Sequence, residues 1–169
     1  NKQLVKGLMW KIEQIRGELN IRLARRIVTA NDTDGKSYFQ HDGPTPGVVD
    51  LGAFLDEEIW VDDPASSKIS SETDPAAAEA FDLEPPPGGS RIRVFTFRPN
   101  DGTAYDPEKL RVSASRFNTG QAMEDKRPGM HTTPTIDYGI VLQGEISLEL
   151  DSGSINLVQG DIVVQRATA

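Results

Sequence analysis

Apolar and polar residues alternate along the last part of the chain, and this pattern constrains the fold more than any other feature. Residues 145–150 place every second side chain on one apolar face, because successive side chains of a strand point to opposite sides. The turn sequence Asp-Ser-Gly-Ser at 151–154 follows and predicts a β-hairpin. The strands predicted in this region are 145–150, 155–158 and 162–165.

Shorter β-type runs precede this region, separated by turn residues. Gly and Pro together number 26 of 169 residues (15 plus 11), which is typical of a turn-rich chain. The Glu-Pro-Pro-Pro-Gly-Gly segment at 84–89 interrupts regular structure, and 75–80 is a candidate single helix. Short strands at roughly ten-residue spacing, without a βαβ rhythm, predict an antiparallel sandwich or barrel. The further predicted strands are 26–29, 37–40, 48–51, 58–61, 91–97 and 138–142.

The N-terminal segment has a different pattern. Residues 4–23 carry apolar side chains at three- and four-residue steps, which predicts an amphipathic helix. We favour a helix packed on its own domain or on a second copy. A membrane-surface helix and a leader are the alternatives. Acidic Glu13 and Glu18 interrupt the basic face that membrane binding would use.

Composition excludes several classes of function. The chain has no cysteine and two histidines, which excludes disulfide scaffolds, thiolate metal sites and a three-histidine site. Its net charge of −8 argues against nucleic-acid binding, although residues 1–30 carry a net +5 (seven basic, two acidic). No apolar run is long enough to span a membrane. Without a recognisable secretory leader, we expect a cytoplasmic protein.

One segment combines groups suited to chemistry. In an extended chain His131, Thr133 and Asp137 share parity and would face the same side, although Pro134 interrupts the strand. A carboxylate beside an imidazole fixes its tautomer, so His131 is a candidate general acid or base. A divalent metal held by His131 and Asp137 is a second interpretation. A hydrogen-bonded histidine without chemistry is the third.

This segment resembles the first motif of the cupin superfamily. His131 and Thr133 take the two histidine positions of that motif, Asp137 the acidic position and Gly144 the glycine. Residues 157–166 resemble part of the second motif. Residues 86–94 (Pro-Pro-Gly-Gly-Ser-Arg-Ile-Arg-Val) and 137–142 (Asp-Tyr-Gly-Ile-Val-Leu) are similar to segments of small bacterial and fungal cupins of poorly defined function.

The resemblance implies an all-β fold, an antiparallel cupin or jelly-roll barrel preceded by a β-rich arm and an N-terminal helix. We therefore divide the chain into a helix (1–24), a β-rich arm with an acidic linker (25–90) and the barrel (91–169). We also expect a homodimer, because an open sheet edge must be covered and a swapped or paired arm would cover it. The resemblance places a further histidine and the closing strands beyond Ala169.

The resemblance also implies a site inside the barrel, with two departures. Thr133 is a poor metal ligand, and Asp137 is shorter than the usual glutamate. We expect either one divalent metal (Fe, Mn, Ni or Zn) on His131 and Asp137, or none. Thr133, Tyr138 and Gln165 would then bind the substrate.

The functional prediction is a small-molecule enzyme, an isomerase, dehydratase, decarboxylase or oxygenase, acting on a small organic acid or aromatic compound. The alternative is a ligand-binding or structural cupin that has lost the usual metal site. Two further features carry secondary predictions. Arg91, Arg93 and Arg98, together with Arg111 and Arg116, form an anion-binding wall or, as we favour, pair with acidic residues. His41 is interpreted as a surface turn histidine.

Overall fold

A computed structural model describes residues 23–50, 54–65, 74–77, 81–98, 117–118 and 130–168. The predicted helix therefore lies outside the described residues, apart from Leu23.

The chain divides into two compact units, residues 1–118 and 119–169, each of which is described by itself. In the first unit the elements are β1 (Arg25–Asn31), β2 (Ser37–Pro44), β3 (Gly47–Asp50), β4 (Phe54–Asp62), the single 3₁₀ turn η1 (Pro75–Ala77), β5 (Phe81–Asp82), β6 (Ser90–Phe97) and β7 (Phe117–Asn118). The second unit contains β8 (Ile136–Ile140), β9 (Glu145–Leu150), β10 (Gly153–Val158) and β11 (Ile162–Arg166).

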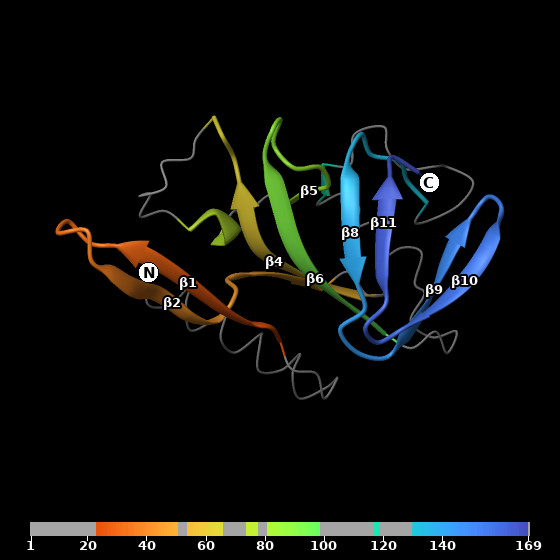
Figure 1. The fold of residues 1–169 in the computed structure, drawn as a ribbon, viewed down its shortest axis with the longest axis horizontal. Helices are drawn as coiled ribbons and strands as arrows, with labels where there is room; N and C mark the ends of the chain where they lie inside the picture. The colour runs from red at the N-terminus through yellow and green to blue at the C-terminus, as the bar shows by residue number, and fades with distance from the viewer. Residues whose placement is uncertain are drawn as a thin grey trace. The chain divides into compact units, whose positions relative to one another are not determined.

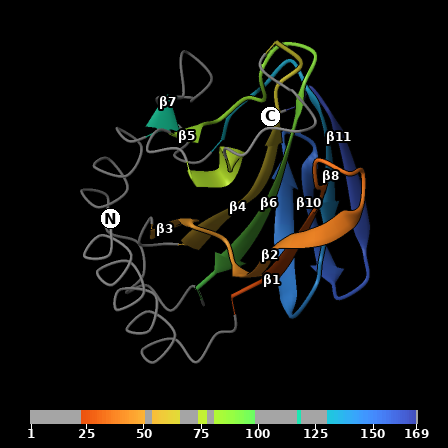
Figure 2. The same cartoon turned by 90° about the vertical axis from the view of Figure 1, so that its left-hand side faces the viewer.

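The predicted all-β class is confirmed for the described residues (Figures 1 and 2). All strand pairs are antiparallel except the short pair β5–β7, which is parallel. Closure of the sheets into a barrel stays a prediction, as does the division of the chain at residues 24 and 90. No helix in the described part of the chain is long and apolar enough to cross a bilayer.

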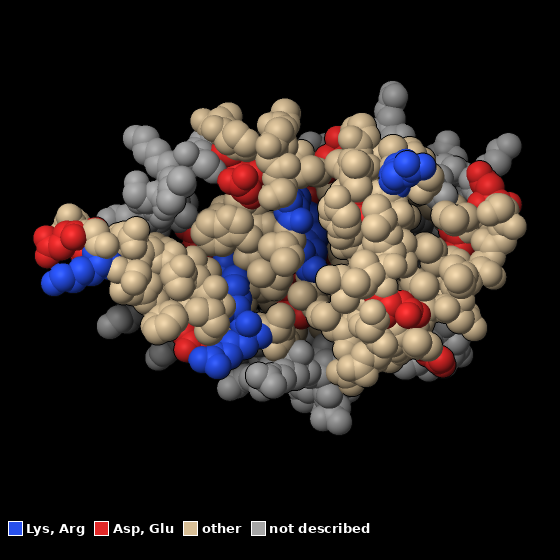
Figure 3. All heavy atoms as spheres, viewed as in Figure 1, with Lys and Arg blue, Asp and Glu red and all other residues tan. Residues whose placement is uncertain are grey.

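Charged side chains fix the β1–β2 hairpin at both of its ends. Figure 3 shows acidic (red) and basic (blue) residues at the two ends of this hairpin. At the turn, Asp32 Oδ1 accepts the backbone N–H groups of Asp34 and Lys36, both at 2.9 Å. At the other end the Arg25 guanidinium binds both carboxylate oxygens of Asp42 at 2.6 Å. His41 lies inside β2, so the prediction of a turn histidine is wrong. The strand continues through it because β1 pairs with β2 as far as Pro44.

The sheet that organises the first unit has the order β3-β4-β6. Its antiparallel register sets Phe54 opposite Phe97, Asp56 opposite Phe95 and Glu58 opposite Arg93. Directly opposed residues share a face, so aromatic and charged side chains follow one another along the same side of the sheet. A bulge after Glu58 then shifts the register.

Two glycines allow segments to approach this sheet closely. A Cβ on Gly47 would lie 2.4 Å from the backbone oxygen of Ala76, so only glycine lets η1 pack against β3. A Cβ on Gly89 would lie 2.0 Å from the backbone oxygen of Asp62, where the chain enters β6. The Pro-Gly-rich break before β6 is therefore a packing requirement as well as a turn.

The second unit contains two ribbons, β8–β11 and β9–β10. The predicted alternation is confirmed in β9 and β10, whose facing pairs are Ile146–Leu157 and Leu148–Ile155. On the opposite face Ser147 Oγ donates to Asn156 Oδ1 at 2.7 Å. In the loop between β10 and β11, Asp161 Oδ2 accepts the backbone N–H of Val158 at 2.8 Å.

Candidate functional site

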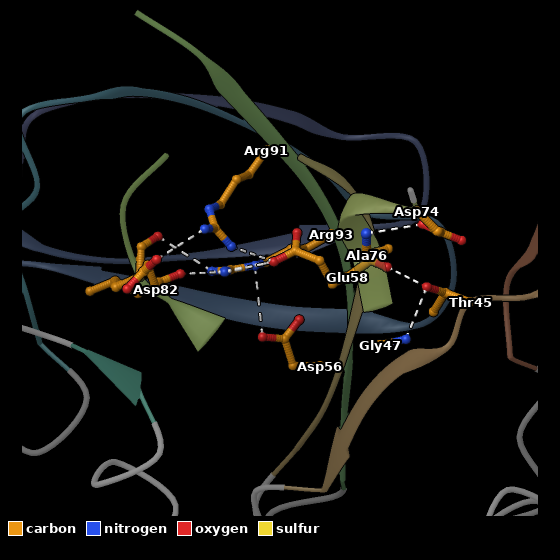
Figure 4. Close-up of polar contacts among 10 residues, drawn as sticks. Thr45, Gly47, Asp56, Glu58, Asp74, Ala76, Asp82, Arg91 and Arg93 are labelled. Carbon is orange, nitrogen blue, oxygen red and sulfur yellow. Dashed lines mark hydrogen bonds and ion pairs between the residues drawn. The ribbon is translucent and has the colours of Figure 1, made fainter. Parts of the chain in front are cut away.

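A buried cluster of charged side chains occupies the β4–β6 face of the first unit. Asp56 and Glu58 are two residues apart on β4, and Arg91 and Arg93 are two residues apart on β6, so each pair points to one side of its strand. The register between the strands then brings the carboxylates and guanidinium groups together (Figure 4). Because a charged group loses its hydration on burial, such a cluster requires close pairing.

Glu58 is the acceptor that both arginines share. Its Oε2 accepts from Arg91 Nη1 at 2.6 Å and from Arg93 Nη2 at 3.0 Å (Figure 4). Arg91 also reaches Asp82 Oδ2 at 3.4 Å. Arg93 donates to the backbone oxygens of Asp82 and Leu83 beside β5. The two guanidinium groups are therefore directed at Glu58 and at the β5 segment.

Asp56 has much weaker contacts with the two guanidinium groups than Glu58 has. Its side chain is fully buried, yet neither carboxylate oxygen has a hydrogen-bond partner among the described residues. The nearest guanidinium atom, Arg93 Nε, lies 3.8 Å from Asp56 Oδ2. Burial raises the pKa of Asp56 to about 6, against the opposing charge of Arg93 and with a smaller contribution from Glu58.

Two further buried contacts hold the edges of this sheet. Arg26 binds Asp74 with both terminal nitrogens and donates to the backbone oxygen of Ile59. Burial raises the pKa of Asp74, but hydrogen bonds from Arg26 and the Ala76 amide outweigh it and the net shift is downward. Glu57 points away from Asp56 and accepts the Ala24 N–H at 3.0 Å. Burial raises the pKa of Glu57 as well.

The residues singled out by the cupin resemblance lie in the second unit. Asp137 and Gln165 are direct partners in the β8–β11 ribbon, so they share a face. Tyr138 pairs with Val164 on the opposite face, away from Asp137. The ribbon therefore brings together two of the five predicted site residues and separates Tyr138 from them.

His131 and Thr133 precede the strand. The segment 132–135 is not a strand, so the shared parity of His131 with Asp137 is interrupted near Pro134, as the sequence suggests. His131 is half-buried and Thr133 is buried. The Thr133 hydroxyl is 2.6 Å from that of Thr135. This position thus holds a hydroxyl pair where the cupin motif has its second histidine.

A divalent metal stays a prediction. Within the described ranges, no three His, Cys, Asp or Glu side chains lie together as a metal site would require. His131 and Asp137 supply two donors, and Thr133 does not complete the set. The described residues therefore do not make up a metal centre by themselves.

The expected pairing of the arginines is confirmed. Arg91 and Arg93 bind the β4 and β5 carboxylates, and Arg98 binds Asp50 at 2.8 Å and 2.9 Å. Arg111 and Arg116 lie outside the described residues. Sequence reasoning missed Asp56 and Glu58. Acidic residues at alternate positions of a predicted strand, matching arginines at alternate positions of another, are the signal that could have identified them.

Comparisons with known proteins give one long match and several short ones. Phomopsin biosynthesis cluster proteins C′ and D of Diaporthe leptostromiformis are each 30% identical to the chain over 155 residues, which covers 88% of this chain and 69% of the relative. The cupin-domain-containing oxidoreductase virC of Hypocrea virens is 54% identical over 41 residues, 24% of this chain and 21% of the relative. No protein-family model matches the chain. The short matches support a cupin-like relationship.

Proposed function

Because the chain belongs to the same family as phomopsin biosynthesis cluster proteins C′ and D, we propose that it is a cupin-type enzyme of small-molecule biosynthesis that works by acid–base chemistry. Its substrate would be a small organic acid or aromatic compound bound inside a cupin barrel. Short matches to cupin-domain oxidoreductases support the cupin assignment. The reaction itself is inferred from the side chains of the second unit.

The observation that carries this proposal is the pairing of Asp137, on the strand that follows His131, with Gln165 on β11. A carboxylate and an amide side by side offer one acceptor and one donor to a polar substrate. His131 is half-buried just before this strand, and an imidazole both accepts and donates a proton near neutral pH.

The proposed step is a proton transfer. His131 removes a proton from a carbon next to the carboxylate or carbonyl of the substrate, and Gln165 donates a hydrogen bond to the oxygen that gains negative charge. The imidazolium then returns the proton to another carbon, which completes an isomerisation. If it instead protonates a departing hydroxyl, one water leaves and the reaction is a dehydration. Neither reaction needs an oxidant or a reductant.

A non-catalytic ligand-binding cupin is the second candidate. It is favoured by Thr133, whose hydroxyl is paired with that of Thr135 at a position where cupin metal sites use histidine. Such a protein would bind the same class of small molecule without turnover. The predicted homodimer belongs to either candidate and is tested by the solution mass of the purified protein.

The two candidates are separated by turnover. The gene is deleted in its host, and the compound that accumulates is incubated in D₂O with the purified wild-type protein, His131→Ala or His41→Asn. We expect the wild type and His41→Asn, which changes the other histidine, to give an isomer carrying one solvent deuterium or a product that has lost water. His131→Ala should lose this activity. Equal turnover by His131→Ala contradicts the acid–base role, and binding without turnover by the wild type supports the second candidate.

A further inference from the structure

Among the described residues of the β4–β6 cluster, carboxylates outnumber guanidinium groups. Asp56, Glu58 and Asp82 contribute three negative charges, and Arg91 and Arg93 contribute two positive ones. Arg91 and Arg93 donate hydrogen bonds to Glu58, Asp82 and Leu83, and Arg93 also forms an ion pair with Asp56. Asp56 differs from the other two carboxylates, because it has no hydrogen bond among the described residues and its contact with Arg93 is an ion pair at 3.8 Å.

A fully buried carboxylate without a hydrogen bond, such as Asp56, is unusual in a folded protein. It is 0% exposed, and both oxygens are without a hydrogen-bond partner among the described residues. Buried polar groups in folded proteins are almost always hydrogen-bonded, because an unpaired one keeps the full cost of its desolvation. A carboxylate of this kind offers two strong acceptor atoms to any donor that reaches it.

Aromatic rings line the face beside Asp56. Phe95 lies directly across from it on β6, and Phe54 precedes it by two residues on β4. Phe54 contacts Phe95 edge-on at 5.6 Å between ring centroids and Phe97 at 5.4 Å. Phe95 and Phe97 are 43% and 54% exposed, so these rings are the solvent-facing part of the cluster.

We propose that the face formed by Asp56, Phe54, Phe95 and Phe97 is a binding site for an organic ammonium group attached to an apolar or aromatic body. The two Asp56 oxygens, which have no hydrogen-bond donor among the described residues, select a cationic donor. The rings favour an organic ammonium over a hydrated metal ion through cation–π contact. The amine would donate to the Asp56 oxygens while its apolar part covers the exposed rings.

We expect the Phe95 ring, which lies opposite Asp56, to move when the ammonium group binds the fully buried carboxylate. Because nearly half of the Phe95 side chain is exposed, its ring can change rotamer without disturbing a closely packed core. The site lies wholly within the first unit and uses no residue of the cupin motif. It therefore goes beyond the proposed function and does not depend on His131.

The test compares ligands that differ in charge. Isothermal titration of the full chain with 2-phenylethylamine, 2-phenylethanol and 3-phenylpropanoate should give the tightest binding for the amine, about tenfold tighter than for the carboxylate. Amide NMR signals of Phe95 and Phe97 should shift on addition of the amine. Equal affinities for the three ligands would overturn the proposal.

Variants locate the site. Asp56→Asn should weaken amine binding about tenfold and remove the preference over 3-phenylpropanoate. Glu57→Gln is the matched control, because Glu57 is a buried neighbour on the opposite side of β4 and glutamine retains an acceptor for the Ala24 N–H. The Glu57→Gln variant should leave amine binding unchanged.

Phe97→Leu changes a half-exposed ring, so it tests the site even if Asp56→Asn does not fold. This variant should weaken amine binding several-fold. Unchanged affinity in Phe97→Leu, or in folded Asp56→Asn, would overturn the proposal.

Discussion

The β4–β6 pair of the first unit and the β8–β11 ribbon of the second arise from the same two-residue period but use it in opposite ways. In β4, four consecutive residues from Leu55 to Glu58 are buried, and three of them are acidic. In β8 all five residues are exposed, including Ile136, Tyr138 and Ile140 on one face. Figure 3 shows the β8 and β11 region as mostly uncharged atoms. Alternation thus predicts which residues share a face, but not what covers that face.

The difference has an energetic consequence. Changes in the charged face of β4 and β6 should disturb a network in which each charge depends on the others. Changes in the apolar face of β8 and β11 should cost little, because exposed side chains gain little from burial. The predictions below test this contrast in order of expected size.

Removing the shared acceptor of the arginines should have the largest effect. Glu58→Gln leaves Arg91 and Arg93 without their main counter-charge in a buried site, and we expect a loss of about 3–5 kcal/mol in the free energy of unfolding. Urea denaturation measures this loss. The control is Glu149→Gln, an exposed residue of β9, which should change stability by less than about 0.5 kcal/mol. Similar values for the two variants would contradict the contrast between the regions.

The pH dependence of stability should reveal Asp56. Its folded-state pKa of about 6 lies above the ordinary value of 3.8, so between these values the folded state binds more protons than the unfolded state. The contribution of Asp56 to stability is therefore greatest below pH 4 and falls by about 3 kcal/mol as the pH rises through 6. Asp74, with a lowered pKa, has the opposite sign.

Comparing the wild type with Asp56→Asn separates this contribution from that of Asp74. The difference in unfolding free energy between the two proteins should change between pH 4 and pH 7 in favour of the variant. A difference that is constant over this range would mean that Asp56 titrates normally in the folded protein.

Replacement on the exposed face should have the smallest effect. Tyr138 is 73% exposed, so Tyr138→Thr should change the free energy of unfolding by less than about 0.5 kcal/mol. Thermal denaturation at several protein concentrations measures the change. A loss above about 1.5 kcal/mol would show that another part of the protein covers this face, and a concentration-dependent loss would identify that part as a second copy.

The strands could be predicted from the sequence because their turns and alternation are local signals. The predicted runs at 91–97 and 145–150 correspond to β6 and β9 within one residue. The sequence predicts a strand over 58–61, whereas β4 begins at Phe54, because the polar residues Asp56 and Glu57 interrupt the apolar run. Their burial depends on partners that are distant in sequence, which the local pattern does not contain.

The candidate site could be predicted only in part. The pairing of Asp137 with Gln165 follows from two strands that the sequence identifies, but their register was not specified by it. That register places Tyr138 on the opposite face of the ribbon from Asp137 and Gln165, with which the sequence prediction combines it in one site. The lack of a hydrogen bond to Asp56 could not be predicted, because it depends on Arg93 donating to Glu58 and Leu83 instead.

The most direct test of a buried carboxylate without a hydrogen-bond donor in the β4–β6 cluster is a ¹³C NMR titration of the Asp56 side chain, assigned with Asp56→Asn. The structure predicts that this carboxyl titrates with a pKa of about 6, because burial outweighs the attraction of Arg93. Addition of 2-phenylethylamine should lower that pKa, since a cation stabilises the ionised form. A value near the ordinary 3.8 for the free protein would show that Asp56 is already paired or hydrated, and would contradict the account.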